Sequence, residues 1–151
     1  MKVAIVGSRT YTNRKKIKEF IFNLKQKFGK ELVVVSGGQK DGADGYAKKY
    51  SLEFNVNYEE YPPQHYNHNI HCVLDARNYN KPYYVSNYFK RNKQIAERCD
   101  KMVAFVTDGR ITSGTEHVIG CAKRLEKKYV LMDWFLYLYI LDSYILILVK
   151  N

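Results

Sequence analysis

The sequence predicts an α/β fold in which helices cover both faces of a parallel sheet of about five strands. Short apolar runs alternate along the chain with segments whose apolar residues recur at helical spacing, as in successive βα units. Residues 33–35 are three valines in a row, which is typical of a strand buried on both faces. Glycines follow the apolar runs directly, where a strand would turn into a helix. We therefore expect a three-layer sandwich with strand order 3-2-1-4-5 and right-handed crossovers.

The chain begins with an apolar run at residues 2–6, which we take as the first strand, without the pattern of a signal peptide. Thr12 or Asn13 can cap the helix that follows, and Gly29 can close it. The spacings three, four, three and four define one apolar helical face, made of Ile17, Phe20, Ile21, Leu24 and Phe28.

A second βα unit occupies residues 32–53. The strand is expected at residues 32–36 and the helix at 43–53, with Ala47 and Tyr50 directed inward. A weaker third strand follows at residues 55–61 and ends at Pro62 and Pro63, since proline cannot donate to a ladder.

Residues 62–85 form a long irregular segment rich in Tyr, Asn and His. Such loops are usually functional or disordered, and the many aromatic residues argue against disorder. The spacing of its metal-ligand types fits no standard zinc pattern. We therefore expect no metal site and interpret the segment as a lid over a crevice; the residues concerned are His65, His68, His71 and Cys72.

The last two units follow the same pattern. A helix is expected at residues 86–98, a strand at 102–106, a helix at 115–125 and a strand at 129–132. The helix at 115–125 is predicted to bury Val118, Ile119, Ala122 and Leu125.

Beyond this domain, expected at residues 1–132, lies an apolar C-terminal extension at 133–151. Its apolar run approaches the roughly 20 residues that a membrane helix needs. Asp142 would lie centrally, however, and costs about 2.5–3.5 kcal/mol there on insertion scales. We favour a buried or partner-covered element over a membrane anchor. Residues 134–141 and 144–149 could form a hairpin, and an exposed extension would indicate a homo-oligomer.

Composition narrows the function classes. The net charge of +10 over 151 residues indicates a polyanionic partner or an anionic ligand. The alternative is that many of the lysines simply lie on the solvated surface of a chain rich in Lys, Asn, Ile and Tyr. Three widely spaced cysteines, Cys72, Cys99 and Cys121, argue against a disulfide framework and for a reducing cytoplasm.

Three polar, glycine-bearing loops follow strands 1, 2 and 4, at residues 7–11, 36–44 and 108–115. In open α/β sheets, ligands bind beyond the carboxyl ends of the strands, where the strand order reverses. With the expected order, that point lies between strands 1 and 4. The loops should therefore converge on one crevice for a nucleotide-like ligand.

The same segments carry a resemblance to a known superfamily. They comprise Gly7-Ser8-Arg9 after strand 1, Ser36-Gly37-Gly38 with Gly42-Ala43-Asp44 after strand 2, Arg91-Asn92, and Gly114-Thr115 after strand 4. In order and spacing the chain resembles the SLOG superfamily, which includes the DprA recombination mediators and the LOG phosphoribohydrolases. It is most similar to the small single-domain YspA-like branch, common in bacteria and phages. The resemblance covers residues 1 to about 132 and implies a Rossmann-like fold that binds nucleotides or nucleotide-derived molecules.

The expected ligand-binding residues follow from these loops. An arginine beside a strand end can fork onto phosphate, glycine amides can approach an anion closely, and Asp44 could accept from ribose hydroxyls or cap its helix. The set is Gly7, Ser8, Arg9, Ser36, Gly37, Gly38, Asp44, Arg91, Asn92, Gly114 and Thr115.

Catalysis is the open question. Arg91 aligns with an arginine that LOG hydrolases use, but Val118 stands where they carry a glutamate. Asp44, Asp108 or Glu116 could substitute as the carboxylate that glycosidic cleavage needs. The leading hypothesis is a sensor or sequestering module with no cofactor beyond a bound nucleotide-derived ligand. A nucleotide N-glycosidase of LOG type is one alternative. The other is a DprA-like binder of single-stranded DNA, motivated by the net charge of +10 and by the basic residues that lie among aromatic ones over residues 81–93.

Overall fold

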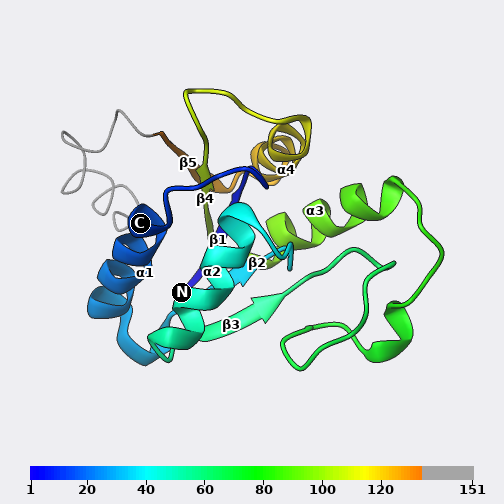
Figure 1. Ribbon diagram of the computed structural model, residues 1–151, viewed down its shortest axis with the longest axis horizontal. Coiled ribbons are helices and arrows are strands. Elements are labelled where there is room, and N and C mark those ends of the chain that lie inside the picture. Colours follow the sequence, from blue (N-terminus) through cyan, green and yellow to red (C-terminus); the bar gives the residue numbers. More distant parts are fainter. Residues whose placement is uncertain (134–151) are drawn as a thin grey trace.

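The computed structural model describes residues 1–133 and contains one parallel sheet of five strands in the order β3-β2-β1-β4-β5 (Figure 1). The strands are β1 (Lys2–Gly7), β2 (Val33–Ser36), β3 (Asn57–Glu60), β4 (Lys101–Phe105) and β5 (Lys128–Met132). The expected order is confirmed. Because β1 pairs with β2 on one side and β4 on the other, the strand order reverses between β1 and β4.

Helices cover both faces of this sheet. They are α1 (Arg14–Phe28), α2 (Gly42–Glu53), α3 (Ser86–Arg98) and α4 (Ser113–Arg124), with short 3-10 turns η1 (Gly29–Glu31) and η2 (Ala76–Asn78). Alternate residues of β1 serve the two faces. Val3 and Ile5 join the core beneath α1 and α2, whereas Ala4 and Val6 join the core beneath α3 and α4. This alternation follows from the two-residue period of a strand.

The predicted helix signals operate as expected in α1. The Asn13 side chain accepts a hydrogen bond from the backbone N–H of Lys16 at 3.1 Å, and Gly29 ends the helix with φ at +54°. Ile17, Phe20, Ile21 and Leu24 are all buried. The apolar face predicted from spacing is therefore the face that packs on the sheet.

The prediction of burial is wrong for one residue. Leu125 is 39% exposed, because α4 ends at Arg124 and Leu125 is the residue that leaves the helix. The other residues expected to be buried from this helix, Val118, Ile119 and Ala122, are buried.

The lid segment, residues 62–85, is irregular apart from η2 and lies beyond the end of β3 (Figure 1). It is tied back to that strand by backbone bonds, from Glu60 N to His71 O at 2.9 Å and from Val73 N to Glu60 O at 3.1 Å. The segment is thus an ordered attachment at the edge of the sheet.

The predictions for the C-terminal extension, including its hairpin or membrane alternatives, fall on residues 134–151, outside the described part of the chain. None of the helices within residues 1–133 combines the length and the apolar character that crossing a bilayer requires.

Candidate functional site

A cavity of about 500 Å³ lies where the loops after β1 and β4 meet α2 and α3. We call it the first cavity. It brings together most of the residues predicted to bind a ligand; Gly7, Ser8, Arg9, Asp44, Arg91, Asn92, Gly114 and Thr115 all line it. The loops after β1 and β4 thus meet at one cavity, to which the 36–44 segment contributes Gln39 and Asp44.

The loop after β1 passes through a narrow gap between β4 and α2. A Cβ on Gly7 would lie 2.3 Å from the Phe105 carbonyl oxygen and 2.8 Å from the Ala43 Cβ, so only glycine fits there. The Ser8 carbonyl oxygen accepts from the amide of Ala43 at 3.2 Å, and the Ser8 hydroxyl accepts from the amide of Thr10 at 3.1 Å. The tight turn leaves Arg9 exposed at the cavity.

The start of α4 forms a second part of the lining. The Thr112 hydroxyl accepts from the amide of Thr115 at 3.4 Å and caps the helix, and the two threonine hydroxyls lie 2.9 Å apart. Asn92 on α3 donates to the Gly114 carbonyl at 3.2 Å, which fixes the turn against α3. The first-turn amides of a helix lack intrahelical partners and lie at the positive end of the helix dipole, so this position favours an anion.

Arg91 connects α3 to the glycine loop after β2. Its Nη1 donates to the Gly37 carbonyl at 2.7 Å and lies 3.5 Å from the Asp44 carboxylate. Its guanidinium also lies 5.8 Å from the centre of the Tyr88 ring. The Arg91 Nε is buried without a hydrogen-bond partner among the described residues. An unsatisfied buried donor is unusual, and this one belongs to a residue that lines the cavity.

Asp44 is a buried carboxylate beside that arginine. Burial raises its pKa above the ordinary value, and the Arg91 charge and the backbone amides of Gln39 and Gly37 oppose the rise only in part. The Gln39 amide lies 3.4 Å from the Asp44 Oδ2. The carboxyl therefore closes the glycine loop as well as lining the cavity.

The rest of the first cavity is largely apolar. Val85, Tyr88 and Phe89 line it from the start of α3, and Val118 lines it from α4. Phe89 packs against the His117 ring, with centroids 4.6 Å apart. A cavity with polar donors in one part and flat rings in another can hold an anionic molecule that also has an aromatic group.

Three of the predicted ligand-binding residues do not line this cavity. Ser36 is fully buried and its hydroxyl bonds to the Tyr58 hydroxyl at 2.7 Å. Gly37 faces Arg91 through its carbonyl, and Gly38 lines a different cavity. Of the alternative carboxylates, Glu116 and Asp108 are exposed and do not line the first cavity either.

A second cavity, of about 530 Å³, lies on the other side of Gly38 and Gln39. Its lining includes Lys40, Lys48, Glu60, His65 and Tyr66. Sequence reasoning missed Lys48 and Glu60. The available signal was weak: the two-residue spacing of Tyr58 and Glu60, which places both side chains on one face of β3.

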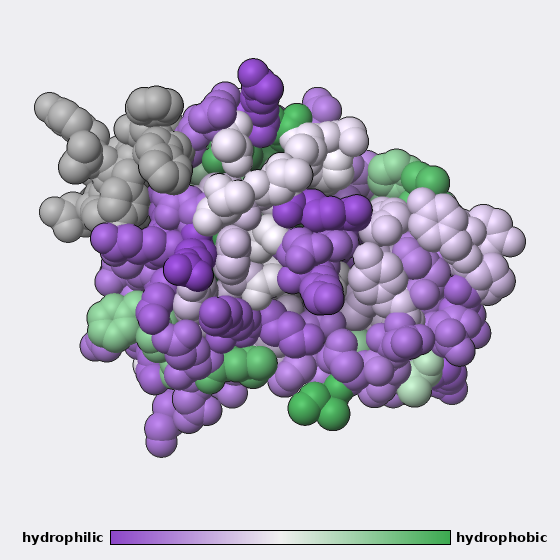
Figure 2. All heavy atoms as spheres, in the orientation of Figure 1, coloured by the Kyte–Doolittle hydropathy of each residue, from purple (hydrophilic) through white to green (hydrophobic). Residues whose placement is uncertain are grey.

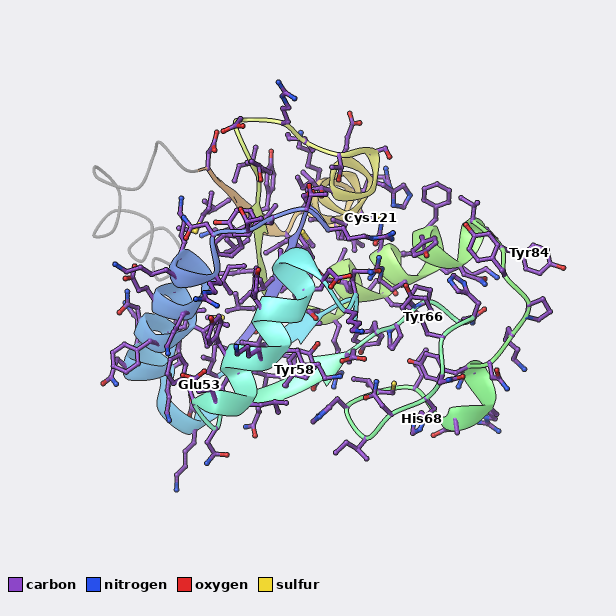
Figure 3. All side chains as sticks on the ribbon, in the orientation of Figure 1. Glu53, Tyr58, Tyr66, His68, Tyr84 and Cys121 are labelled. Carbon is purple, nitrogen blue, oxygen red and sulfur yellow. The ribbon has the colours of Figure 1, made fainter. Side chains whose placement is uncertain are left out.

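The lid segment contacts both cavities through a cluster of rings. His65 packs against Tyr83 and Tyr88 with centroids 4.8 and 5.1 Å apart, and the Tyr66 hydroxyl donates to the Gln39 side chain at 3.1 Å. Burial, followed by the Arg91 charge, lowers the pKa of His65. Figure 3 shows Tyr66 close to α3, with His68 well away from it. Within residues 1–133, no three His, Cys, Asp or Glu side chains gather into a group that could hold a metal ion.

Comparison with known proteins identifies one family. Residues 1–68 match the model of the YAcAr family, described as the YspA, cpYpsA-related SLOG family. The match spans β1 to β3 and the start of the lid segment, and so includes the loop after β1, the glycine loop and Asp44. No curated protein and no solved structure matches the chain.

Proposed function

Because residues 1–68 match the model of the YspA, cpYpsA-related SLOG family, we propose that the first cavity binds a nucleotide or a nucleotide-derived small molecule. A match to this family suggests a nucleotide-related ligand. In this proposal the protein senses or sequesters the molecule. Its three cysteines are free thiols, which is consistent with a protein of the reducing cytoplasm.

One observation carries the proposal: a single cavity combines an anion-binding part with an aromatic part. The anion-binding part consists of the start of α4, Arg9 and Arg91. The aromatic part consists of Tyr88 and Phe89. The volume of the whole first cavity, about 500 Å³, lies within the usual range for small-molecule sites, roughly 300–1,000 Å³.

Roles within the cavity follow from the chemistry of the donors. The phosphate would lie at the first turn of α4, where Gly114 supplies a backbone amide and Arg9 supplies charge. Asp44, the one carboxylate among the described residues that line the cavity, would accept from a ribose hydroxyl.

An N-glycosidase of LOG type is less well supported. Val118, at the position where those hydrolases carry a glutamate, is buried and lines the cavity. Asp44 is already engaged with Arg91 and the glycine loop. Cleavage needs a carboxylate placed to activate water or to support an oxocarbenium-like transition state, and the apolar Val118 cannot supply one.

Calorimetry with the ribonucleoside 5′-monophosphates tests the proposal. We expect at least one to bind the wild type and Arg9→Ala to weaken it about tenfold or more, since a charge-assisted contact to phosphate contributes about 1.5–3 kcal/mol. Lys30→Ala is the matched control, because Lys30 is exposed and lies in η1 rather than at the cavity. Unchanged affinity in a folded Arg9→Ala protein would overturn the assignment of the site.

Chromatography of the same mixtures separates a binding module from an enzyme. We expect the wild type to release little free base or ribose phosphate, because Val118 stands where the hydrolases carry their glutamate. The general acid–base help that such a carboxylate gives typically contributes 10²–10⁴-fold to the rate. Robust multiple turnover that is lost in Asp44→Asn would instead establish an enzyme.

A further inference from the structure

The second cavity is built around a buried carboxylate. Glu60 is 2% exposed, and its oxygens accept from the Lys48 ammonium at 2.8 Å, the Asn69 amide at 2.7 Å and the Tyr58 hydroxyl at 3.1 Å. These donors come from α2, the lid segment and β3. A buried carboxylate is costly unless it is paired and hydrogen-bonded, so three separate elements are held together around this one group.

This polar cluster continues to the glycine loop. The Tyr58 hydroxyl also bonds to the Ser36 hydroxyl at 2.7 Å, directly beneath the loop. Gly38 adopts φ +70°, and a Cβ there would lie 2.7 Å from the Glu60 Oε1. The loop that separates the two cavities is therefore seated on the Glu60 cluster.

The two cavities share one residue, Gln39, which lines both. Cations flank it. Arg9 lines the first cavity and Lys40 the second, and both also line one shallow groove of about 310 Å³ beside α2. A phosphate that passed over Gln39 would lie between these two positive charges.

We propose that the second cavity receives the second half of the ligand. The ligand is then two nucleosides, or a nucleoside and a sugar, joined through phosphate. One half lies in the first cavity, and the phosphate crosses Gln39 between Arg9 and Lys40. This inference rests on the proposed function.

The chemistry of the second cavity fits a neutral, hydrogen-bonding group. Lys48 and Glu60 form an ion pair, so together they add no net charge. Asn67, Asn69 and Gln39 supply amides that both donate and accept, and the His65 and Tyr66 rings supply flat surface. Sugar hydroxyls and base edges carry the matching donors and acceptors. The volume of about 530 Å³ lies within the usual range for small-molecule sites, roughly 300–1,000 Å³, and leaves room for a second nucleoside or a sugar.

The test uses calorimetry to compare probes that carry one nucleoside, called one-half probes, with probes that carry two nucleosides joined through phosphate, called two-half probes. The probes are the four nucleoside 5′-monophosphates, the matching symmetrical dinucleoside monophosphates and the matching dinucleoside pyrophosphates. We expect a two-half probe to bind at least about tenfold more tightly than its monophosphate. The comparison between one and two phosphates identifies the linkage.

The double substitution Lys48→Met with Glu60→Gln removes the charge pair together, so neither charge is left buried alone. We expect it to abolish the advantage of the two-half probe and to leave monophosphate affinity unchanged. Lys40→Ala, at an exposed position, should reduce the same advantage without a risk to folding, and Lys30→Ala should change nothing.

Each outcome decides between the two proposals. If monophosphates bind but the two-half probes bind no more tightly, the inference fails and the proposed function stands. The inference also fails if the two-half probe is favoured but neither Lys40→Ala nor the double variant reduces that advantage. If no probe of either kind binds the wild type, both proposals are overturned.

Discussion

Arg91 has a second task that its resemblance to a hydrolase arginine does not reveal. A Cβ on Gly37 would lie 1.7 Å from the Arg91 Nη1, so the side chain occupies the space that a larger residue would need. The guanidinium thus supports the glycine loop through one nitrogen, Nη1, while the same side chain lines the first cavity. A substitution of Arg91 would change both the loop and the ligand contact. Arg9, whose side chain is exposed, is the cleaner residue to test.

The buried carboxyl of Asp44 makes stability depend on pH. Its pKa in the folded protein is raised by burial above the unfolded value of about 3.9. A raised pKa favours the protonated folded form. The stability that this carboxyl contributes is therefore present below the unfolded pKa and is lost as pH rises through the folded pKa.

We accordingly predict that Asp44→Asn gains stability relative to the wild type as pH rises from about 4 to about 7. Thermal denaturation across that range measures the difference in melting temperature. Asp41→Asn, at an exposed neighbouring position, is the control. A difference that shrinks with rising pH would show that the Arg91 charge outweighs the cost of burying the carboxylate.

At the scale of elements, one side chain caps the start of α4. Thr112 caps the helix through the amide of Thr115, and the same turn lines the first cavity. The cap and the proposed phosphate site are thus one structure. The Gly114 amide could not be presented to a ligand if this turn unwound.

Thr112→Ala should lower the free energy of unfolding by about 1 kcal/mol, the usual contribution of an N-cap hydroxyl. Urea denaturation measures it, and Thr112→Ser should retain most of the stability because serine caps equally well. Equal losses in the two variants would mean that the hydroxyl is not what holds the turn.

At the scale of the whole molecule, one surface has the composition of a site for single-stranded nucleic acid. Tyr83, Tyr84 and Phe89 are exposed at the end where the lid segment joins α3, beside Lys81, Lys90 and Lys93. Figure 2 shows pale rings gathered over that end of a mostly hydrophilic face, and Figure 3 places Tyr84 at its tip. Rings interleaved with lysines are the pattern that stacks on single strands.

We nevertheless predict weak, unselective binding of single-stranded DNA, because much of the net charge of +10 is spread over the lysine-rich surface. Fluorescence anisotropy with a labelled oligonucleotide should show affinity that falls steeply with salt, with a slope of about −0.7 per phosphate contact. Tight binding that persists at physiological salt, and is lost when Tyr83 and Tyr84 become alanine, would make nucleic acid the principal partner.

The sequence by itself determined the order of elements, the sheet topology and most of the first cavity. Each rests on a local or topological rule: valine runs make buried strands, glycines mark strand–helix turns, and parallel strands bring their carboxyl ends to one edge. Arg9 and Thr115 could be found in this way because they follow such signals directly, whereas Arg91, inside α3, was indicated only by the family resemblance.

Only the tertiary structure decided which partners each side chain meets. Ser36 follows its strand as predicted, yet it lies buried against Tyr58 rather than in the cavity. The Glu60 cluster joins residues from α2, β3 and the lid segment, and no spacing along the chain connects them. Leu125 is exposed because α4 stops one residue earlier than its apolar pattern. Periodicity fixes the face of an element, whereas long-range packing fixes where the element ends and what it touches.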